Sequence, residues 1–146
     1  MYKLYLDDHR KPADSAKKFP ELAHLYECKD WIMVSSFDEF TRIIRYNWEH
    51  SEFPSVISFD HDLHVEHTKW YFENGGHDNP PNPNDAHFVN KTGEDCLFWL
   101  ISHCEATKMP FPECYVHSAN PKGRENLEKL IAQYQKFLRK IDGEMG

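Results

Sequence analysis

The chain has 146 residues, a length typical of one domain that can bury a substantial core without disulfides or metals. Its hydrophobic fraction of 40% and aromatic fraction of 14% are those of a folded domain and exclude a disordered chain. The formal net charge of −7 argues against broad, sequence-independent binding to nucleic-acid backbones, which needs a basic surface. A small anionic ligand, or one nucleic-acid end that is gripped locally, is compatible with this charge.

The sequence shows no sign of export or membrane insertion. No apolar run approaches the roughly 18 residues that cross a bilayer. The first eight residues, "MYKLYLDD", already contain charges, unlike a secretory signal peptide. We therefore expect a cytoplasmic protein. The four cysteines lack Cys-x-x-Cys spacing, so reduced and mostly buried thiols are a better interpretation than a zinc site.

The first half of the chain predicts strands in three short apolar segments: Leu4–Leu6, Trp31–Val34 and Val56–Phe59. Between the first two, residues 9–29 carry two prolines and weak periodicity, and only "PELAHLYE" suggests a short helix. Ser36, followed three residues later by Glu39, forms a capping box that predicts a helix starting near residue 37. Apolar residues continue this helix at helical spacing: Phe37, Phe40, Ile44 and Trp48.

The second half begins with a segment rich in glycine, proline and asparagine, including "NGGHDNPPNPND". It predicts a long loop insertion at about 64–92 within a single domain that spans 1–146, either a functional lid or a tolerated surface insertion. Thr92 is expected to cap an apolar helix, and Tyr115 and Val116 belong to a fourth strand. Asn120 followed by Pro121 predicts the cap and first turn of the last helix. That helix has the clearest apolar stripe of the sequence: Leu127, Leu130, Ile131, Tyr134, Phe137, Leu138 and Ile141.

Strands that alternate with helices predict an α/β fold with a mostly parallel sheet and helices on its faces. In such sheets, ligands bind beyond the carboxyl ends of the strands. Three of the predicted strands run into polar clusters, "LDDHR", "FDHDL" and "VHSANP". A parallel sheet places all three clusters at the same edge, and this shared position is the strongest indication of a functional site.

The acidic residues of these clusters predict a metal site. Asp7 and Asp8 follow the first strand, and Asp60 follows the third. Together they supply the hard oxygen ligands that Mg²⁺ prefers, and Asp62 either adds a ligand or supports the others from behind. Charged loop starts are the alternative interpretation of the same residues.

His61 and His117 each stand at a strand end. Histidine can accept or donate a proton near neutral pH, so two histidines that face one phosphate could divide the roles of acid and base. The residues alone do not tell which histidine would take which role. Each is also compatible with a structural or surface position.

The segment "HSANPKGREN" has the parts of an anion site. Ser118 and Asn120 offer polar side chains, and the helix that starts near Pro121 directs backbone N–H groups outward. Arg124, and Arg10 after the first acidic pair, can make bidentate contacts with phosphate oxygens. A capped helix with a surface arginine is the alternative.

Four segments together resemble a known family: "LYLDDHRKP", "ISFDHDL", "VHSANPKGREN" and, more weakly, "KTGEDCLFWL". The chain is similar to the cyclic-phosphate-processing receiver-like domains, small proteins that are common in phages and bacteria. The resemblance implies a receiver-like (flavodoxin-like) three-layer fold. It also implies a role in opening cyclic phosphates, such as the 2′,3′-cyclic ends of cleaved RNA.

In ordinary receiver domains an acidic pair and a strand-end aspartate bind Mg²⁺, and the aspartate accepts a phosphoryl group. The resemblance places Asp7, Asp8 and Asp60 at these positions and Ser118 at the hydroxyl position. Two departures favour hydrolysis over phosphotransfer. The sequence lacks a clear fifth strand with the usual lysine, and it adds the two strand-end histidines.

The leading hypothesis is a phosphodiesterase acting on a cyclic phosphate, either a small phosphorylated ligand or a cyclic-phosphate RNA end. Its expected catalytic residues are Asp60, His61 and His117. Its expected substrate-binding residues are Arg10, Ser118, Asn120 and Arg124. Mg²⁺ or another divalent cation would be held by Asp7, Asp8, Asp60 and Asp62, although a metal-free mechanism with two histidines is also open.

Two alternatives involve no catalysis. The chain could be a receiver-like module that binds a partner protein or sequesters a cyclic nucleotide. It could also be a structural interaction protein whose polar clusters only cap helices. An assay with cyclic phosphates distinguishes the three hypotheses. Ring opening would support the enzyme, binding without turnover would support the binding module, and the absence of both would leave the structural protein.

Overall fold

The computed structural model describes residues 1–63 and 92–145. The predicted loop insertion falls on residues 64–91, outside the described residues, so this prediction stays untested. The elements follow in the order β1 (Tyr2–Leu6), α1 (Pro12–Lys18), η1 (Pro20–Leu22), α2 (Ala23–Tyr26), β2 (Trp31–Val34), α3 (Phe37–Glu49), β3 (Pro54–Phe59), α5 (Gly93–Thr107), β4 (Glu113–Val116) and α6 (Pro121–Met145).

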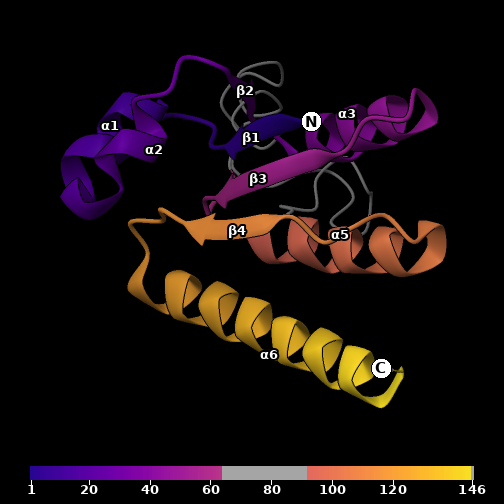
Figure 1. The fold of residues 1–146 in the computed structure, drawn as a ribbon. Coiled ribbons are helices and arrows are strands. Elements are labelled where there is room, and N and C mark those ends of the chain that lie inside the picture. Colours follow the sequence, from indigo (N-terminus) through magenta and orange to yellow (C-terminus); the bar gives the residue numbers. More distant parts are fainter. Residues whose placement is uncertain (64–91, 146) are drawn as a thin grey trace, which may run out of the picture.

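Within the described residues, four parallel strands form one sheet in the order β2-β1-β3-β4. The last residues of the strands are in register: Leu6 lies opposite Val34 and Phe59, and Phe59 lies opposite Val116. The segments after β1, β3 and β4 therefore leave the sheet at one edge, as Figure 1 shows for the strand arrowheads. This confirms the predicted α/β fold with a short parallel sheet.

The larger part of the core lies between the sheet and helices α3, α5 and α6. Leu4, Leu6, Ile57 and Phe59 point to this side, because alternate residues of a strand face the same side of the sheet. The helices meet them with fully buried apolar residues: Phe40, Ile44, Leu97, Leu100 and Leu127. In Figure 1, α6 lies next to α5 and along the β4 side of the sheet.

A smaller core covers the opposite side of the sheet. Tyr5 points there from β1 and packs with Ala16 of α1, Phe19 and Tyr26 of α2. The tyrosine rings of Tyr5 and Tyr26 meet edge to face, with centroids 6.2 Å apart. Helices on both sides of the sheet give the three layers expected for a flavodoxin-like domain.

The predicted caps of α3, α5 and α6 are all present. The Ser36 side chain accepts the Glu39 N–H, but the Glu39 carboxylate accepts from the Ser35 hydroxyl, so the predicted capping box of α3 is only half formed. Thr92 forms a complete capping box with Asp95. Asn120 Oδ1 accepts the Gly123 N–H at 3.0 Å, and Pro121 occupies the first turn. None of the helices in the described parts of the chain is long and apolar enough to span a membrane.

Helix α1 has no counterpart among the predicted elements. It buries only Ser15 and Ala16, so its seven residues carry no apolar period to detect. The segment "PELAHLYE" forms η1 and α2 in place of one helix. β3 starts at Pro54, two residues earlier than expected, because the first position of a strand tolerates the missing N–H of proline.

Candidate functional site

Three carboxylates converge where β1 and β3 end. Asp7, Asp8 and Asp60 each offer one oxygen, and these oxygens all lie within 4.8 Å of one another. Asp7 and Asp60 are only 4% and 7% exposed, whereas Asp8 is half-buried. The three oxygens suit a hard divalent cation such as Mg²⁺, so the residues present fit the predicted metal.

Asp7 is held in place on both carboxylate oxygens. Oδ1 accepts the backbone N–H groups of His9 and Arg10 at 2.8 and 2.9 Å, and Oδ2 lies 3.0 Å from His117 Nε2. Burial pushes the pKa of Asp7 upward, but the hydrogen bonds from His117, Arg10 and His9 outweigh it, so that the pKa lies below its usual value. Asp7 is therefore a carboxylate at neutral pH.

Asp60 is in the opposite electrostatic situation. Burial, and next the negative charge of Asp7, raise the pKa of Asp60 above its usual value, although His117, the His61 N–H and Arg10 act against the shift. The His61 N–H donates to Asp60 Oδ1 at 2.9 Å. Two buried carboxylates this close repel each other, and a bound cation would remove the repulsion.

His117 is buried behind Asp7, and both of its ring nitrogens are hydrogen-bonded. Nε2 faces Asp7, and Nδ1 lies 2.7 Å from Ser58 Oγ. The ring stacks on Tyr5, with centroids 4.2 Å apart and planes 8° from parallel. Its position follows from strand alternation, which places Tyr5, Ser58 and His117 on the same side of the sheet.

The contacts of His117 extend into a hydrogen-bond chain. Tyr26 Oη lies 2.8 Å from Ser58 Oγ, so the chain runs from Tyr26 through Ser58 and His117 to Asp7. Because the Asp7 carboxylate can only accept, Nε2–H of His117 donates to it. In a neutral ring, Nδ1 then accepts from Ser58, which accepts from Tyr26. The chain connects the acidic cluster with the smaller core.

His61 has a different and more open environment, with a side chain that is 14% exposed. Its Nδ1 lies 2.8 Å from Asp62 Oδ1, and its Nε2 lies 3.7 Å from Glu94 Oε2. Asn120 Nδ2 donates to the same Asp62 carboxylate at 3.3 Å. Asp62 therefore orients His61 and connects it to the start of α6.

Two glycines at helix starts allow this close packing. A Cβ atom on Gly123 would overlap the His61 ring, and a Cβ on Gly93 would overlap the Asp60 carbonyl oxygen. The Gly93 N–H also donates to the His61 carbonyl at 2.7 Å. The first turns of α5 and α6 can reach the end of β3 only because both positions lack a side chain.

Three of the four predicted substrate-binding residues lie around these groups. Arg10 Nη1 donates to the His117 carbonyl at 3.4 Å. Ser118 is buried, and its Oγ accepts the Asn120 N–H at 3.1 Å. Lys18, which the sequence did not single out, donates to the Ser118 carbonyl at 3.4 Å. A helix from the smaller-core side thus contributes a cation to this edge.

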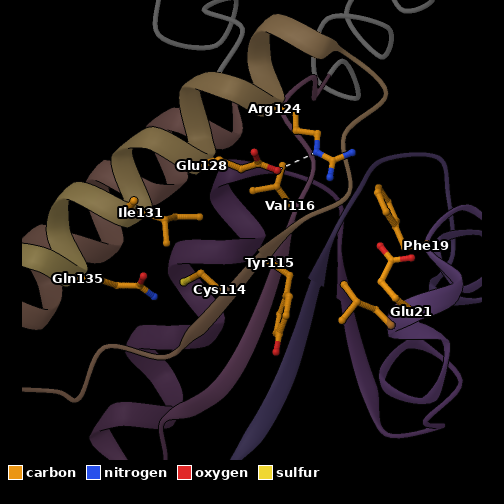
Figure 2. A pocket seen from close by; sticks show the side chains of 11 residues that line it. Phe19, Glu21, Cys114, Tyr115, Val116, Arg124, Glu128, Ile131 and Gln135 are labelled. Atoms are coloured by element: carbon orange, nitrogen blue, oxygen red, sulfur yellow. Dashed lines mark hydrogen bonds and ion pairs between the residues drawn. The ribbon is translucent and has the colours of Figure 1, made fainter.

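Arg124 points elsewhere. Its Nε donates to Glu128 Oε1 at 2.8 Å, and its guanidinium lies 4.7 Å from the centroid of the Phe19 ring. Figure 2 shows Arg124 in a groove along β4, with Glu128 on one side and Phe19 on the other. The structure therefore does not bring Arg124 together with the acidic cluster.

The residues that sequence reasoning missed are mainly partners of the two histidines: Tyr5, Tyr26, Ser58, Glu94 and Gly93. Ser58 had a signal, because it is the one polar residue inside the apolar stretch "VISF" and shares its parity with His117 along the paired strands. Glu94 stood in the first turn of a helix, where an acidic residue is common for dipole reasons alone. Tyr26 gave no signal.

A parallel sheet of this order, with an acidic cluster at its carboxyl edge, is the architecture of a receiver-type α/β domain. The family model described as the cyclic-phosphate processing receiver domain matches residues 2–133. The chain belongs to this family, and the resemblance of its four segments is confirmed. No curated protein and no solved structure gives a significant match.

Proposed function

We propose that the chain hydrolyses a cyclic phosphate to a phosphomonoester. The observation that carries the proposal is the convergence of Asp7, Asp8 and Asp60, within 4.8 Å of one another, in a member of a cyclic-phosphate processing family. The substrate would be a cyclic nucleotide or a cyclic-phosphate RNA end. The net charge of −7 favours recognition of that end over recognition of a long backbone.

Asp7, Asp8 and Asp60 would hold Mg²⁺ or another divalent cation. When bound, the cation would neutralise phosphate charge and polarise the phosphorus–oxygen bonds. Asp7 is already fixed as a carboxylate by His117 and two backbone N–H groups, so it needs no rearrangement to act as a ligand. We assign Asp62 to the orientation of His61, because its carboxylate already accepts from that ring and from Asn120.

His61 is the histidine we assign to proton transfer. Nδ1–H of His61 donates a hydrogen bond to Asp62, so Nε2 is the nitrogen that exchanges protons with water or substrate. Water attacks phosphorus and gives its proton to Nε2, one ring P–O bond breaks, and the departing oxygen takes up the proton that Nε2 then releases, directly or through a water molecule. The result is one phosphomonoester and one free hydroxyl, with no other reactant consumed.

His117 is the residue for which the proposal departs from the sequence-based expectation. Its ring is buried, and both nitrogens are bonded to Ser58 and Asp7, so a leaving oxygen has no access to it. We assign it to the positioning of Asp7. Arg10, together with Ser118 and Asn120, stands where a phosphate beside the cation would be bound, next to the start of α6.

A ring-opening assay tests the proposal. The purified chain is incubated with 2′,3′-cyclic AMP in Mg²⁺ or in EDTA, and the phosphomonoester is separated by chromatography. We expect turnover in Mg²⁺ only, and a loss of at least about 100-fold in Asp60→Asn and in His61→Gln. His50→Gln, an exposed histidine at the end of α3, serves as the matched control and should keep full activity.

The burial of His117 also favours the second candidate, a module that binds a cyclic nucleotide without turnover, because it removes one of the two expected acid–base groups. Calorimetric titration with the same nucleotide distinguishes the candidates. Saturable binding without product in Mg²⁺ would support the module and contradict hydrolysis. Turnover that is equal in wild type, Asp60→Asn and His61→Gln would contradict the assigned site.

A further inference from the structure

The outer edge of β4 carries backbone groups that the sheet does not use. β4 pairs with β3 on one side and is the last strand of the sheet. The His117 N–H donates to the Phe59 carbonyl at 3.0 Å. In a parallel strand, alternate residues direct both N–H and C=O to the same neighbour, so Glu113 and Tyr115 also face β3. Cys114 and Val116 therefore direct their backbone groups away from the sheet.

No hydrogen bond to the backbone of Cys114 or Val116 from this outer side is present among the described residues. Edge strands with such unused donors and acceptors are templates for pairing, and proteins usually shield them with charges, prolines or a covering element. The two outward residues of β4, cysteine and valine, provide neither of the first two kinds of protection.

A groove of about 230 Å³ runs along this edge, and it has sides from two layers. Phe19, Glu21 and Leu22 line it from the smaller-core layer. Residues of α6 line it from the other layer: Arg124, Glu128, Ile131, Ala132 and Gln135. Figure 2 shows the two sets on either side of Cys114 and Tyr115. Both layers thus extend past the last strand.

The opposite edge of the sheet is built differently. Among residues 1–63 and 92–145, a hollow beside β2 is lined by Met33 and Val34 and by residues of α3: Glu39, Arg42, Ile43 and Tyr46. These described residues line it from one helical layer, whereas described residues of two layers line the β4 groove. In the described part of the chain, lining from two layers is therefore a feature of the β4 edge, and the groove lies between these two layers.

We propose that the β4 groove binds an extended peptide segment, which adds to the sheet as a fifth strand next to β4. Cys114 and Val116 would each offer one N–H and one C=O, and alternate peptide side chains would contact Phe19 and Leu22 on one side and Ile131 on the other. A second folded copy fits less well, because its own layers would collide with the two sides of the groove. The proposal is independent of hydrolysis.

Charge indicates the composition of the peptide. The lining contains two carboxylates, Glu21 and Glu128, and one guanidinium, Arg124, which is paired with Glu128 at 2.8 Å. The groove therefore has a net negative charge within a chain of net charge −7. A segment that alternates apolar and basic residues is complementary to it.

The test uses a fluorescein-labelled peptide of alternating valine and lysine, about six residues long as in an ordinary strand. Fluorescence anisotropy reports binding to the full chain. We expect saturable binding that weakens about tenfold or more in Ala132→Trp, which fills the groove. The matched control is Gln133→Trp on the next, exposed position of α6, outside the lining. A valine–glutamate peptide of equal length should bind more weakly.

Amide hydrogen exchange supplies a second measurement that needs no substitution. Added peptide should protect the N–H groups of Cys114 and Val116, because strand addition uses them. Absence of saturable binding, equal binding to both tryptophan variants, or binding without protection of Val116 would each overturn the proposal. A concentration-dependent dimer that Ala132→Trp disrupts, with no peptide binding, would assign the groove to a second copy. Loss of cyclic-phosphate hydrolysis would leave all these outcomes unaffected.

Discussion

At the scale of single residues, Asp60 is expected to reduce stability at neutral pH. Burial and the charge of Asp7 raise its pKa in the folded state, so folding favours the protonated form. The protonated form of Asp60 contributes stability that is fully present below the unfolded pKa of about 3.9. This stability is lost as the pH rises through the folded pKa. Asp60→Asn should therefore raise Tm at pH 7, by a few degrees for about 1 kcal/mol.

Thermal unfolding at several pH values measures this effect. The difference in Tm between Asp60→Asn and wild type should shrink as the pH falls toward 4, because wild-type Asp60 then gains its proton. Asp38→Asn, an exposed carboxylate on α3, is the control and should show no such gain at neutral pH. A lower Tm for Asp60→Asn at pH 7 would contradict the sign of the shift.

A divalent cation should stabilise the folded chain by mass action, since only the folded state brings Asp7, Asp8 and Asp60 together. We expect Mg²⁺ to raise the wild-type Tm and to have little effect on Asp60→Asn. His117→Gln should require more Mg²⁺ for the same shift, because Asp7 loses one of its hydrogen bonds. His50→Gln should behave as wild type. An equal shift in all four proteins would mean that Mg²⁺ binds elsewhere.

The roles of single residues were predictable from the sequence where a strand fixes the direction of the side chain. Asp7 and Asp60 follow neighbouring strands, so one edge had to receive both. Arg124 was assigned to the same site because it stands in the segment "HSANPKGREN" and its guanidinium can bind phosphate. Its direction depends on how α6 crosses β4 and on its contacts with Glu128 and Phe19, which no local pattern encodes.

At the scale of elements, the first turn of α6 packs directly against the His61 ring, because Gly123 has no side chain there. Gly123→Ala places a Cβ into the His61 ring, so the ring or the helix has to move. We expect a loss of about 1–3 kcal/mol of stability from overpacking. We also expect ring opening to fall about tenfold or more, because a shift of a catalytic group by about 1 Å is costly.

Chemical denaturation and the ring-opening assay give the two readouts for Gly123→Ala. Lys122→Ala, at the neighbouring exposed position, is the control for changes in the first helical turn. Wild-type stability and activity in Gly123→Ala would show that α6 adjusts without cost, and that the glycine does not position His61.

A helix was predictable from the sequence when it had a capping residue and several buried apolar positions at helical spacing. α3, α5 and α6 combine a capping residue with a stripe that reaches the larger core, and each was expected near its observed start. α1 and α2 are short and bury few side chains. Their helical structure therefore depends on contacts with Tyr5 and Trp31, which come from other parts of the chain. Tertiary packing decides such segments.

At the scale of the whole molecule, the parallel sheet separates two kinds of surface. Its carboxyl edge collects the acidic cluster, His61 and Arg10, whereas the β4 groove beside it is mostly apolar with backbone donors and acceptors. The parallel sheet with helices on its faces follows from the alternation of strands and helices, and this much was expected from the sequence. The order of the strands, β2-β1-β3-β4, was not predicted. The hydrogen-bond chain through His117 joins the smaller core to the acidic cluster, and it exists only after the layers have packed.

The net charge of −7 leads to a prediction about substrate length. If the chain recognises only the cyclic end, each further phosphate of an RNA adds repulsion from a negative surface and no new contact. We expect kcat/KM for a cyclic-ended dinucleotide to equal or exceed that for a longer single-stranded RNA at low salt. Because salt screens repulsion, the longer RNA should improve relative to the dinucleotide as ionic strength rises. The measurement is a salt series with both substrates, and a 3′-phosphate RNA of the same sequence serves as competitor. Rates that increase with RNA length and fall steeply with salt would instead reveal a basic track for the backbone, and would contradict recognition of the end alone.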